Sequence, residues 1–291
     1  MAPSPLLGGL ALLLATCQLP TATAPSYYLS SSHGADTNNG SSASSPWRTL
    51  RRANQTALEP GDSLLLRRGD VWRGEVLLLP AARGTLGRSI TIASYGDASA
   101  ARPLLCGLNK STDIPMILDA ASYVAVRGLA FSTAKVGLYL RYWQSYGSEA
   151  ISITDCLFSD IDDPEFDPYT MARQGTLTAL DISWSSGIMV GGQLRSIAEP
   201  GVVLSGLNVS NTTFANCAVG LQVAVGNWNS PGGGPGNPLP FSRVEGLHMS
   251  DVTQVHTTSS GEFLLHLFVY FRTFAPSREA ATGSDRTRVL G

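Results

Sequence analysis

The sequence is poor in charged residues, and the charges that it does carry nearly balance. Only 14% of the 291 residues are charged, and the formal net charge is -2. No basic stripe interrupts this balance, and lysine occurs only at Lys110 and Lys135. Because proteins bind nucleic acids through a positively charged surface, this composition argues against a nucleic-acid partner.

The chain also lacks an apolar run long enough for a stable membrane span. The run LLGGLALLLATC, which begins at Leu6, has the length of a signal-peptide core instead. The following TATA places Ala22 and Ala24 where a small-residue cleavage site is expected. We therefore expect a signal peptide over residues 1–24 and a secreted protein, located outside the cell or in a cell wall. Asn-x-Ser/Thr sequons fit this route as glycosylation sites, at Asn39, Asn54, Asn109, Asn208 and Asn211.

Cysteine is scarce, which limits disulfide and zinc chemistry. Cys17 would leave with the signal peptide, so that Cys106, Cys156 and Cys217 remain. An odd number cannot pair completely, and at least one of the three is expected to be a small buried hydrophobe. No CxxC motif and no Cys/His pair has the spacing of zinc ligands, which argues against a structural zinc site.

Turn-forming residues are abundant, with 30 Gly and 17 Pro beside a hydrophobic content of 43%. This combination favours a β protein with many turns. The aliphatic segments SLLLRRG, EVLLLP and SITIASYG, separated by Gly or Pro, are expected strands. Before them, Ser45 resembles a helix N-cap with Pro46 at the first helical position, and the spacing of apolar residues predicts a short amphipathic helix from Trp47 to Thr56.

The segment from Tyr27 to Gly107 resembles the opening of secreted right-handed parallel β-helix proteins of the pectin-lyase-like superfamily. YYLS, DTNNG, PWRTL and PGDSLLLRRGDVW carry the resemblance. It implies an all-β, right-handed parallel β-helix whose short helix covers the first coil. It does not imply one activity, because lyases, epimerases, hydrolases and proteins of unknown role share this opening. We expect a strand, loop and capping helix over residues 25–62, the β-helix over 63–270 and a disordered tail over 271–291.

An internal repeat supports a solenoid independently. Three segments end in Phe131, Phe158 and Phe214, and three others, GLYLRYWQS, ALDISWSS and GLQVAVGNWNS, share an aliphatic-x-aliphatic triplet followed by Trp and Ser. The middle residues of the triplets are Tyr139, Asp181 and Gln222, which are 42 (181 − 139) and 41 (222 − 181) positions apart. This is the period of one long-looped coil.

Strand alternation predicts which side chains of these triplets leave the core. Tyr139, Asp181 and Gln222 should form an outward column about 4.8 Å apart per coil, with Arg141 and Ser183 in a second column. LLHLF would add a fourth coil with His266 in the column. A competing register puts Phe263 there instead.

Trp143, Trp184 and Trp228 follow the triplets, where each coil must turn. They are interpreted as packing residues of the turns or as platforms for sugar rings. An acidic insertion begins with Asp160, Asp162 and Asp163 and continues to Asp167. It is a solvated loop or a site for a hard cation such as calcium, and no nucleotide or organic cofactor is expected.

These positions predict a polysaccharide partner on the outer sheet face. In a polysaccharide lyase, Arg141 would neutralise the uronate and Asp181 would take part in removing the proton at C5. In a glycoside hydrolase, a second carboxylate would have to join Asp181, from the acidic insertion. The third hypothesis is a noncatalytic wall or matrix protein that binds glycans, and the sequence leaves the three open.

Overall fold

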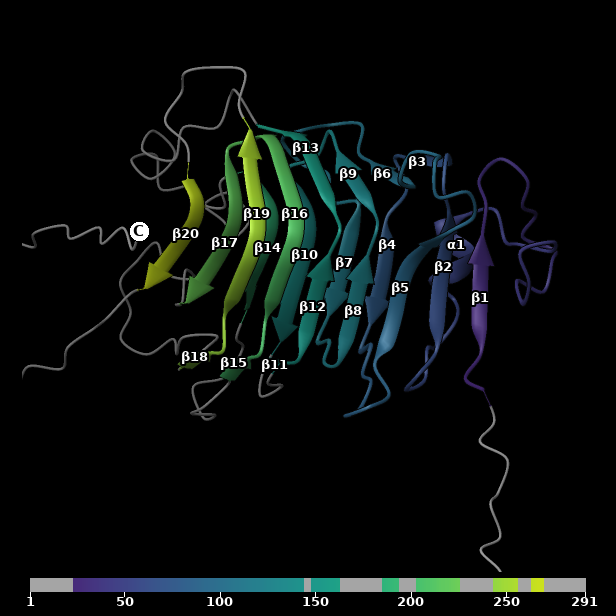
Figure 1. Cartoon of the computed structure of the whole chain (residues 1–291), viewed down its shortest axis with the longest axis horizontal. Helices are drawn as coiled ribbons and strands as arrows, with labels where there is room; N and C mark the ends of the chain where they lie inside the picture. The colour runs from purple at the N-terminus through teal and green to yellow at the C-terminus, as the bar shows by residue number, and fades with distance from the viewer. Residues whose placement is uncertain are drawn as a thin grey trace, which may run out of the picture.

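The computed structural model describes residues 23–143, 148–162, 185–193, 203–225, 243–255 and 263–269. Within these ranges the regular secondary structure is nearly all strand, and every pairing between named strands is parallel. The strands stack in successive layers along the longest axis of the molecule (Figure 1). The all-β parallel β-helix predicted from the sequence is therefore confirmed.

Two sheets carry most of the solenoid. The larger, with eleven strands, contains β1 (Ser26–Leu29), β2 (Ser63–Arg67), β5 (Ile90–Tyr95), β8 (Val124–Arg127), β12 (Ile151–Thr154), β16 (Asn208–Cys217), β13 (Leu157–Ile161), β9 (Ala130–Ser132), β6 (Leu104–Cys106) and β3 (Val71–Arg73) in that order, with β19 (His248–Val255) also on β16. The six-stranded sheet contains β4 (Leu77–Pro80), β7 (Met116–Asp119), β10 (Val136–Trp143), β14 (Ser186–Gln193), β17 (Val219–Val225) and β20 (Phe263–Val269), in that order.

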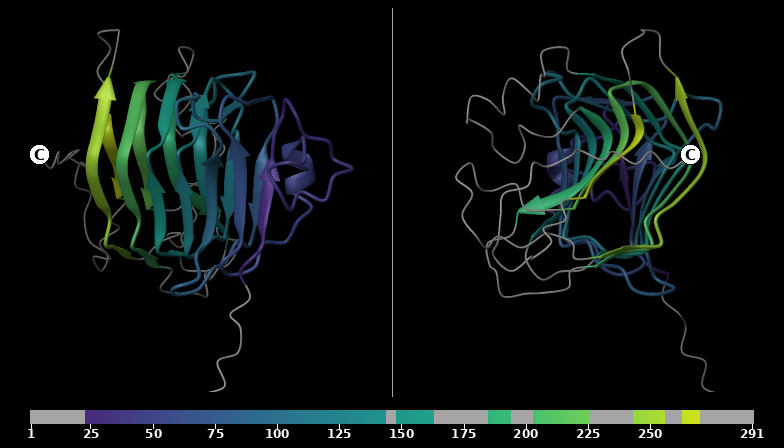
Figure 2. Two further views of the ribbon diagram at one scale, coloured as in Figure 1. Left: turned by 45° about the vertical axis from the view of Figure 1, so that its right-hand side comes forward. Right: turned by 90° about the vertical axis from the view of Figure 1, so that its left-hand side faces the viewer.

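The larger sheet forms two faces of the solenoid, because β16 continues around a corner. Its first half pairs with β12 and its second half with β13. A small third sheet of β11 (Ser148–Glu149), β15 (Val203–Ser205) and β18 (Arg243–Glu245) lies beside the coils. The chain thus visits each face once per coil, and the coils stack in the order of the sequence (Figure 2).

Left-handed backbone conformations mark the corner between the first two faces. The φ angles there are 67° at Gly128, 55° at Asp155, 45° at Asn211 and 53° at Asp251, one residue in each of four successive coils. Gly, Asn and Asp are the residues that adopt this conformation most readily. The residue before each of them pairs in register with the corresponding residue of the adjacent coil. The corner therefore recurs at the same position in every one of these coils.

A ladder of phenylalanine rings fills the interior. Phe131, Phe158 and Phe214 are fully buried and stack with ring centroids 4.7 and 5.2 Å apart. Glycine makes room for these rings on the facing sheet. A Cβ atom at Gly137 would lie 2.7 Å from the ring of Phe158, and one at Gly187 would lie 2.5 Å from the ring of Phe214. The repeated spacing of Phe and Gly in the sequence therefore has a steric cause.

The three cysteines are free thiols buried in the solenoid, as expected of at least one of them. Burial raises the pKa of the Cys156 thiol to about 11, from an ordinary value of 9.0. It raises the pKa of the Cys217 thiol to about 12. Both thiols are therefore neutral in the folded protein at physiological pH.

Stability is expected to decrease at alkaline pH because these thiols ionise more readily in the unfolded chain. Their contribution is fully present below pH 9.0 and is lost as the pH rises through 11 to 12. Urea unfolding between pH 7 and pH 11 tests this expectation, with the double variant Cys156→Ala/Cys217→Ala as the comparison. Its free energy of unfolding should fall less steeply above pH 9.0 than that of the wild type, and equal slopes would contradict the expectation.

A cap covers the first coil, as the resemblance implied, but its helix differs from the expected one. Helix α1 spans only Leu50–Ala53, and its N-cap is Thr49, whose side chain accepts a hydrogen bond from the Arg52 N–H. Ser45 is therefore not the N-cap. Trp47 is extended and forms a parallel bridge with Leu29. No helix in the described part of the chain is long and apolar enough to cross a membrane.

Hydrogen bonds fasten the cap to the first strand of the six-stranded sheet. The Leu50 N–H donates to Glu75 Oε2 at 2.8 Å. Asn54 donates from Nδ2 to the Val76 carbonyl at 2.8 Å and accepts at Oδ1 from the Leu78 N–H at 2.9 Å. The Asn54 amide thus bonds the backbone at the free edge of β4, where no strand of the six-stranded sheet lies.

Candidate functional site

The outer face of the six-stranded sheet carries the candidate site. Leu138, Ile188 and Leu221 lie in the main core, so the side chains that follow them along each strand point away from it. Six residues that pair in register on successive strands, from β4 to β20, form the first outward row: Leu78, Ile117, Tyr139, Met189, Gln222 and His266. Tyr139 and Met189 belong to a second, smaller apolar cluster with Val136.

The predicted place of Asp181 in this row is wrong. Met189 pairs with both Tyr139 and Gln222, so GIMV at residues 187–190 is the strand of this coil. The spacings are 50 (189 − 139) and 33 (222 − 189) rather than 42 and 41. Asp181, Ser183 and Trp184 lie outside the described residues. The sequence contains a feature that identifies the correct strand. Gly precedes the triplet in GLYL, GIMV and GLQV, whereas Ala precedes it in ALDI.

The preferred register of the fourth coil is confirmed. His266 pairs with Gln222, and Phe263 pairs with Val219, three residues away from the position that the competing register gave it. The backbone register thus places His266 in the first outward row. Its proposed role in binding or proton transfer stays a prediction.

The second outward row contains an ion pair that sequence reasoning missed. Arg141 pairs in register with Asp119, and its Nη2 and Nε donate to the two carboxylate oxygens at 2.8 and 3.2 Å. The side chains are 27% and 18% exposed, respectively. Gly191 occupies the position predicted for Ser183. The alternation in MILD, with Met116 and Leu118 buried, could have shown that Asp119 points outward.

Three side chains of the first row, those of Tyr139, Met189 and Gln222, are more deeply buried than an open sheet face implies. Tyr139 is 8% exposed and Gln222 is 2% exposed. Burial raises the pKa of the Tyr139 phenol to about 12, so the phenol is a neutral hydrogen-bond donor at physiological pH. The Oε1 atom of Gln222 is buried without a hydrogen-bond partner. A ligand donor could pair with this oxygen once the groups that cover it move aside.

The remaining sequence-predicted residues do not belong to the two outward rows in the described part of the chain. Trp143 ends β10 opposite Gln193 of β14, and Trp228 and Asp163 lie outside the described residues. Asp160 adopts a φ of 53° and accepts a hydrogen bond from Asn216. Asp162 pairs with Lys110 at 2.6 Å. No group of three potential metal ligands occurs among the described residues, and the calcium hypothesis stays a prediction.

The five sequons differ in how their asparagines are used. Asn39 and Asn109 are exposed, and each accepts a hydrogen bond from the backbone N–H two residues later. Asn54 uses both amide atoms to hold β4. Asn208 lies at the start of β16, and Asn211 lies at the corner of that strand. Glycosylation stays a prediction for all five.

Comparison with known proteins relates the chain to enzymes that act on carbohydrates. No protein-family model matches it. It is 39% identical over 141 residues to a lacto-N-biosidase from Bifidobacterium longum subsp. longum, which covers 41% of this chain and 9% of that protein. The chain thus matches only a small part of this relative, and the match does not establish the activity of the whole enzyme for it.

Solved structures with detectable similarity include a GH136 lacto-N-biosidase from Eubacterium ramulus. It is 18% identical, with a TM-score of 0.43, and the match covers 68% of this chain and 42% of that one. A rhamnogalacturonan lyase is 13% identical, with a TM-score of 0.40, and its match covers 80% of this chain and 66% of that one.

Proposed function

We propose that the chain binds a neutral oligosaccharide on the outer face of the six-stranded sheet, at Tyr139, Gln222 and the Asp119–Arg141 pair. The observation that carries the proposal is the Oε1 atom of Gln222, which is buried on this face without a partner. Leaving a polar atom unpaired costs about 1–3 kcal/mol, and a sugar hydroxyl or acetamido N–H would remove that cost on binding. The local identity to a lacto-N-biosidase supports a sugar as the ligand.

The ion pair favours a neutral glycan over an acidic one. At the described register positions of the two outward rows, the formally charged side chains are Asp119 and Arg141, and they neutralise each other. A polysaccharide lyase needs a cation to neutralise the carboxylate of the uronate. Here Asp119 already neutralises the charge of Arg141 and accepts two of its hydrogen bonds. A paired carboxylate and guanidinium can instead accept from and donate to sugar hydroxyls.

Hydrolysis is the second candidate function, and the local match to a lacto-N-biosidase favours it over elimination. A glycoside hydrolase of the usual kind uses two carboxyl groups on either side of the scissile bond. Asp119 is the carboxylate that the described part of the two outward rows supplies. Its partner would have to come from outside the described residues, where Asp181 lies.

Replacing Gln222 by Leu is expected to weaken binding of a neutral glycan more than tenfold without lowering the melting temperature. The change removes the ligand's acceptor, and losing a buried Oε1 atom that has no partner in the folded protein offsets the cost of removing the rest of the amide. Calorimetric titration with lacto-N-tetraose measures the affinity, and Met189→Leu in the same row is the matched control. Unchanged affinity in Gln222→Leu would remove this residue from the site.

The same titration with tetragalacturonate separates neutral from acidic ligands. We expect measurable binding of lacto-N-tetraose and weaker binding of tetragalacturonate. Assays for new reducing ends and for unsaturated uronate products on both sugars distinguish hydrolysis from elimination. Tighter binding of tetragalacturonate, or formation of unsaturated products, would replace the proposal by a lyase.

A further inference from the structure

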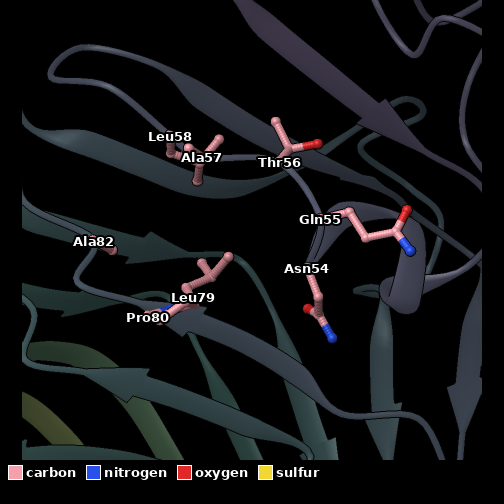
Figure 3. A pocket seen from close by; sticks show the side chains of 8 residues that line it. All are labelled: Asn54, Gln55, Thr56, Ala57, Leu58, Leu79, Pro80 and Ala82. Atoms are coloured by element: carbon pink, nitrogen blue, oxygen red, sulfur yellow. The ribbon is translucent and has the colours of Figure 1, made fainter.

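A cleft of about 240 Å³ opens at the β4 end of the six-stranded sheet. One wall is the segment 54–58 that follows α1, and the other is the end of β4 at Leu79 and Pro80, with Ala82 beyond it (Figure 3). Neither the sequence repeats nor the proposed binding residues include this cleft. The hydrogen bonds of Asn54 to the backbone at β4 fix the position of the cleft between the cap and the first coil.

The walls of the cleft are held at a defined separation. Asn54 bonds the backbone at Val76, just before β4, and at Leu78 within it, at 2.8 and 2.9 Å. Leu79 is 3% exposed and Ala82 is 4% exposed, so these two residues of the second wall belong to the packed interior. A cleft with such walls is largely preformed, which reduces the entropy lost when a ligand binds.

The lining suits an uncharged ligand with both polar and apolar surfaces. It contains no ionisable side chain. Asn54, Gln55 and Thr56 supply the polar residues, whereas Ala57, Leu58, Leu79 and Pro80 supply the apolar ones. A sugar ring has this combination, because hydroxyl groups surround its edge and C–H groups cover its faces. The volume is below that of most drug-binding pockets, which is consistent with a single ring.

The cleft continues the second outward row of the proposed glycan site. Pro80, at its wall, pairs in register with Asp119, which pairs with Arg141. The Ala81 N–H donates to the Asp119 carbonyl at 2.7 Å and keeps the two strands together beyond Pro80. Two strand spacings, about 10 Å, therefore separate the position of Arg141 from that of Pro80 along the stack. A glycan held at the ion pair and running along the stack would reach the cleft.

We infer that this cleft is a subsite for one neutral sugar residue at the end of a glycan whose other residues bind at the Asp119–Arg141 pair. The inference rests on the proposed function. It adds a length requirement, since a tetrasaccharide can fill both places and a disaccharide cannot. The longer sugar should therefore bind more tightly, and the difference should depend on the cleft.

Filling the cleft tests this requirement. Ala57 is exposed, so Ala57→Trp places an indole ring at the wall without disturbing the core, and Ala57→Leu is a smaller second obstacle. The control is Leu86→Trp, at a position that is 88% exposed and outside the cleft. Calorimetric titration with lacto-N-tetraose and lacto-N-biose, together with a thermal melt of each variant, gives the readout.

We expect Ala57→Trp to weaken lacto-N-tetraose binding more than tenfold, to the level of lacto-N-biose, while lacto-N-biose binding stays unchanged. Ala57→Leu should have an intermediate effect and Leu86→Trp none. If the wild type binds lacto-N-tetraose and both Ala57 variants bind it equally well, the subsite is overturned and the proposed function stands. If the wild type binds neither sugar, the proposed function fails and the subsite fails with it.

Discussion

Replacing Phe158 by Ala is expected to lower the free energy of unfolding by about 3–5 kcal/mol. The ring is fully buried between Phe131 and Phe214, at centroid distances of 4.7 and 5.2 Å. Its removal leaves a cavity in the middle of the stack and ends two aromatic contacts. The walls of the solenoid cannot collapse into the space easily, because hydrogen bonds between the coils fix their separation. Urea unfolding followed by circular dichroism measures the loss.

Two controls show whether the loss of stability arises from the buried position or simply from the loss of side-chain volume. Phe158→Leu keeps most of the volume and should cost clearly less than Phe158→Ala. Leu86→Ala removes a large side chain that is 88% exposed, and its effect should stay within about 0.5 kcal/mol. If Phe158→Ala costs no more than Leu86→Ala, the phenylalanine ladder is not a main source of stability.

The fold could be predicted from the sequence because local and repeated signals agree. The aliphatic segments before Tyr95 become strands β2, β4 and β5, as expected. The recurrence of Phe131, Phe158 and Phe214 predicts stacked coils, and the three rings do stack. Because such features recur from coil to coil, a coil that is recognised in one part of the sequence strengthens the prediction of a coil in the next.

The assignment of Asp181 failed because strand alternation does not identify the coil to which a strand belongs. Both ALDI and GIMV have the pattern of a strand with one buried face. The steric requirement of the core distinguishes them. A ring of the ladder lies against the strand, so the position before the triplet must lack a Cβ, and Gly187 meets this condition. The spacing between coils could not decide between ALDI and GIMV, because loop length is weakly constrained in a solenoid and the spacings are unequal.

The capping helix was misplaced because tertiary contacts override its local signals. Ser45 and Pro46 are a favourable helix start, but Trp47 bridges to Leu29 and donates its indole N–H to the Asn38 carbonyl at 3.0 Å. Asp36 then accepts hydrogen bonds from the N–H groups of both Arg48 and Thr49, so Thr49 becomes the N-cap and the helix begins only at Leu50. These partners are far apart in sequence, so propensity alone could not have identified them.

Replacing Arg141 by Ala is expected to weaken binding of lacto-N-tetraose more than tenfold and to lower the free energy of unfolding by about 1–3 kcal/mol. The stability loss arises because Asp119, only 18% exposed, keeps a charge without its bidentate partner. It is smaller than for a fully buried pair, since water still reaches both side chains. Urea unfolding and calorimetric titration measure the two effects.

The double variant Arg141→Ala/Asp119→Ala separates recognition from structural support. Removing both charges should restore most of the lost stability, because no carboxylate is left unpaired. If the pair contacts the sugar, binding stays weak in the double variant, whereas a purely structural pair would let it return. Arg102→Ala is the control, since Arg102 pairs with Asp155 at a corner of the larger sheet and its loss should leave the affinity unchanged. Wild-type affinity in Arg141→Ala would place the glycan elsewhere on the solenoid.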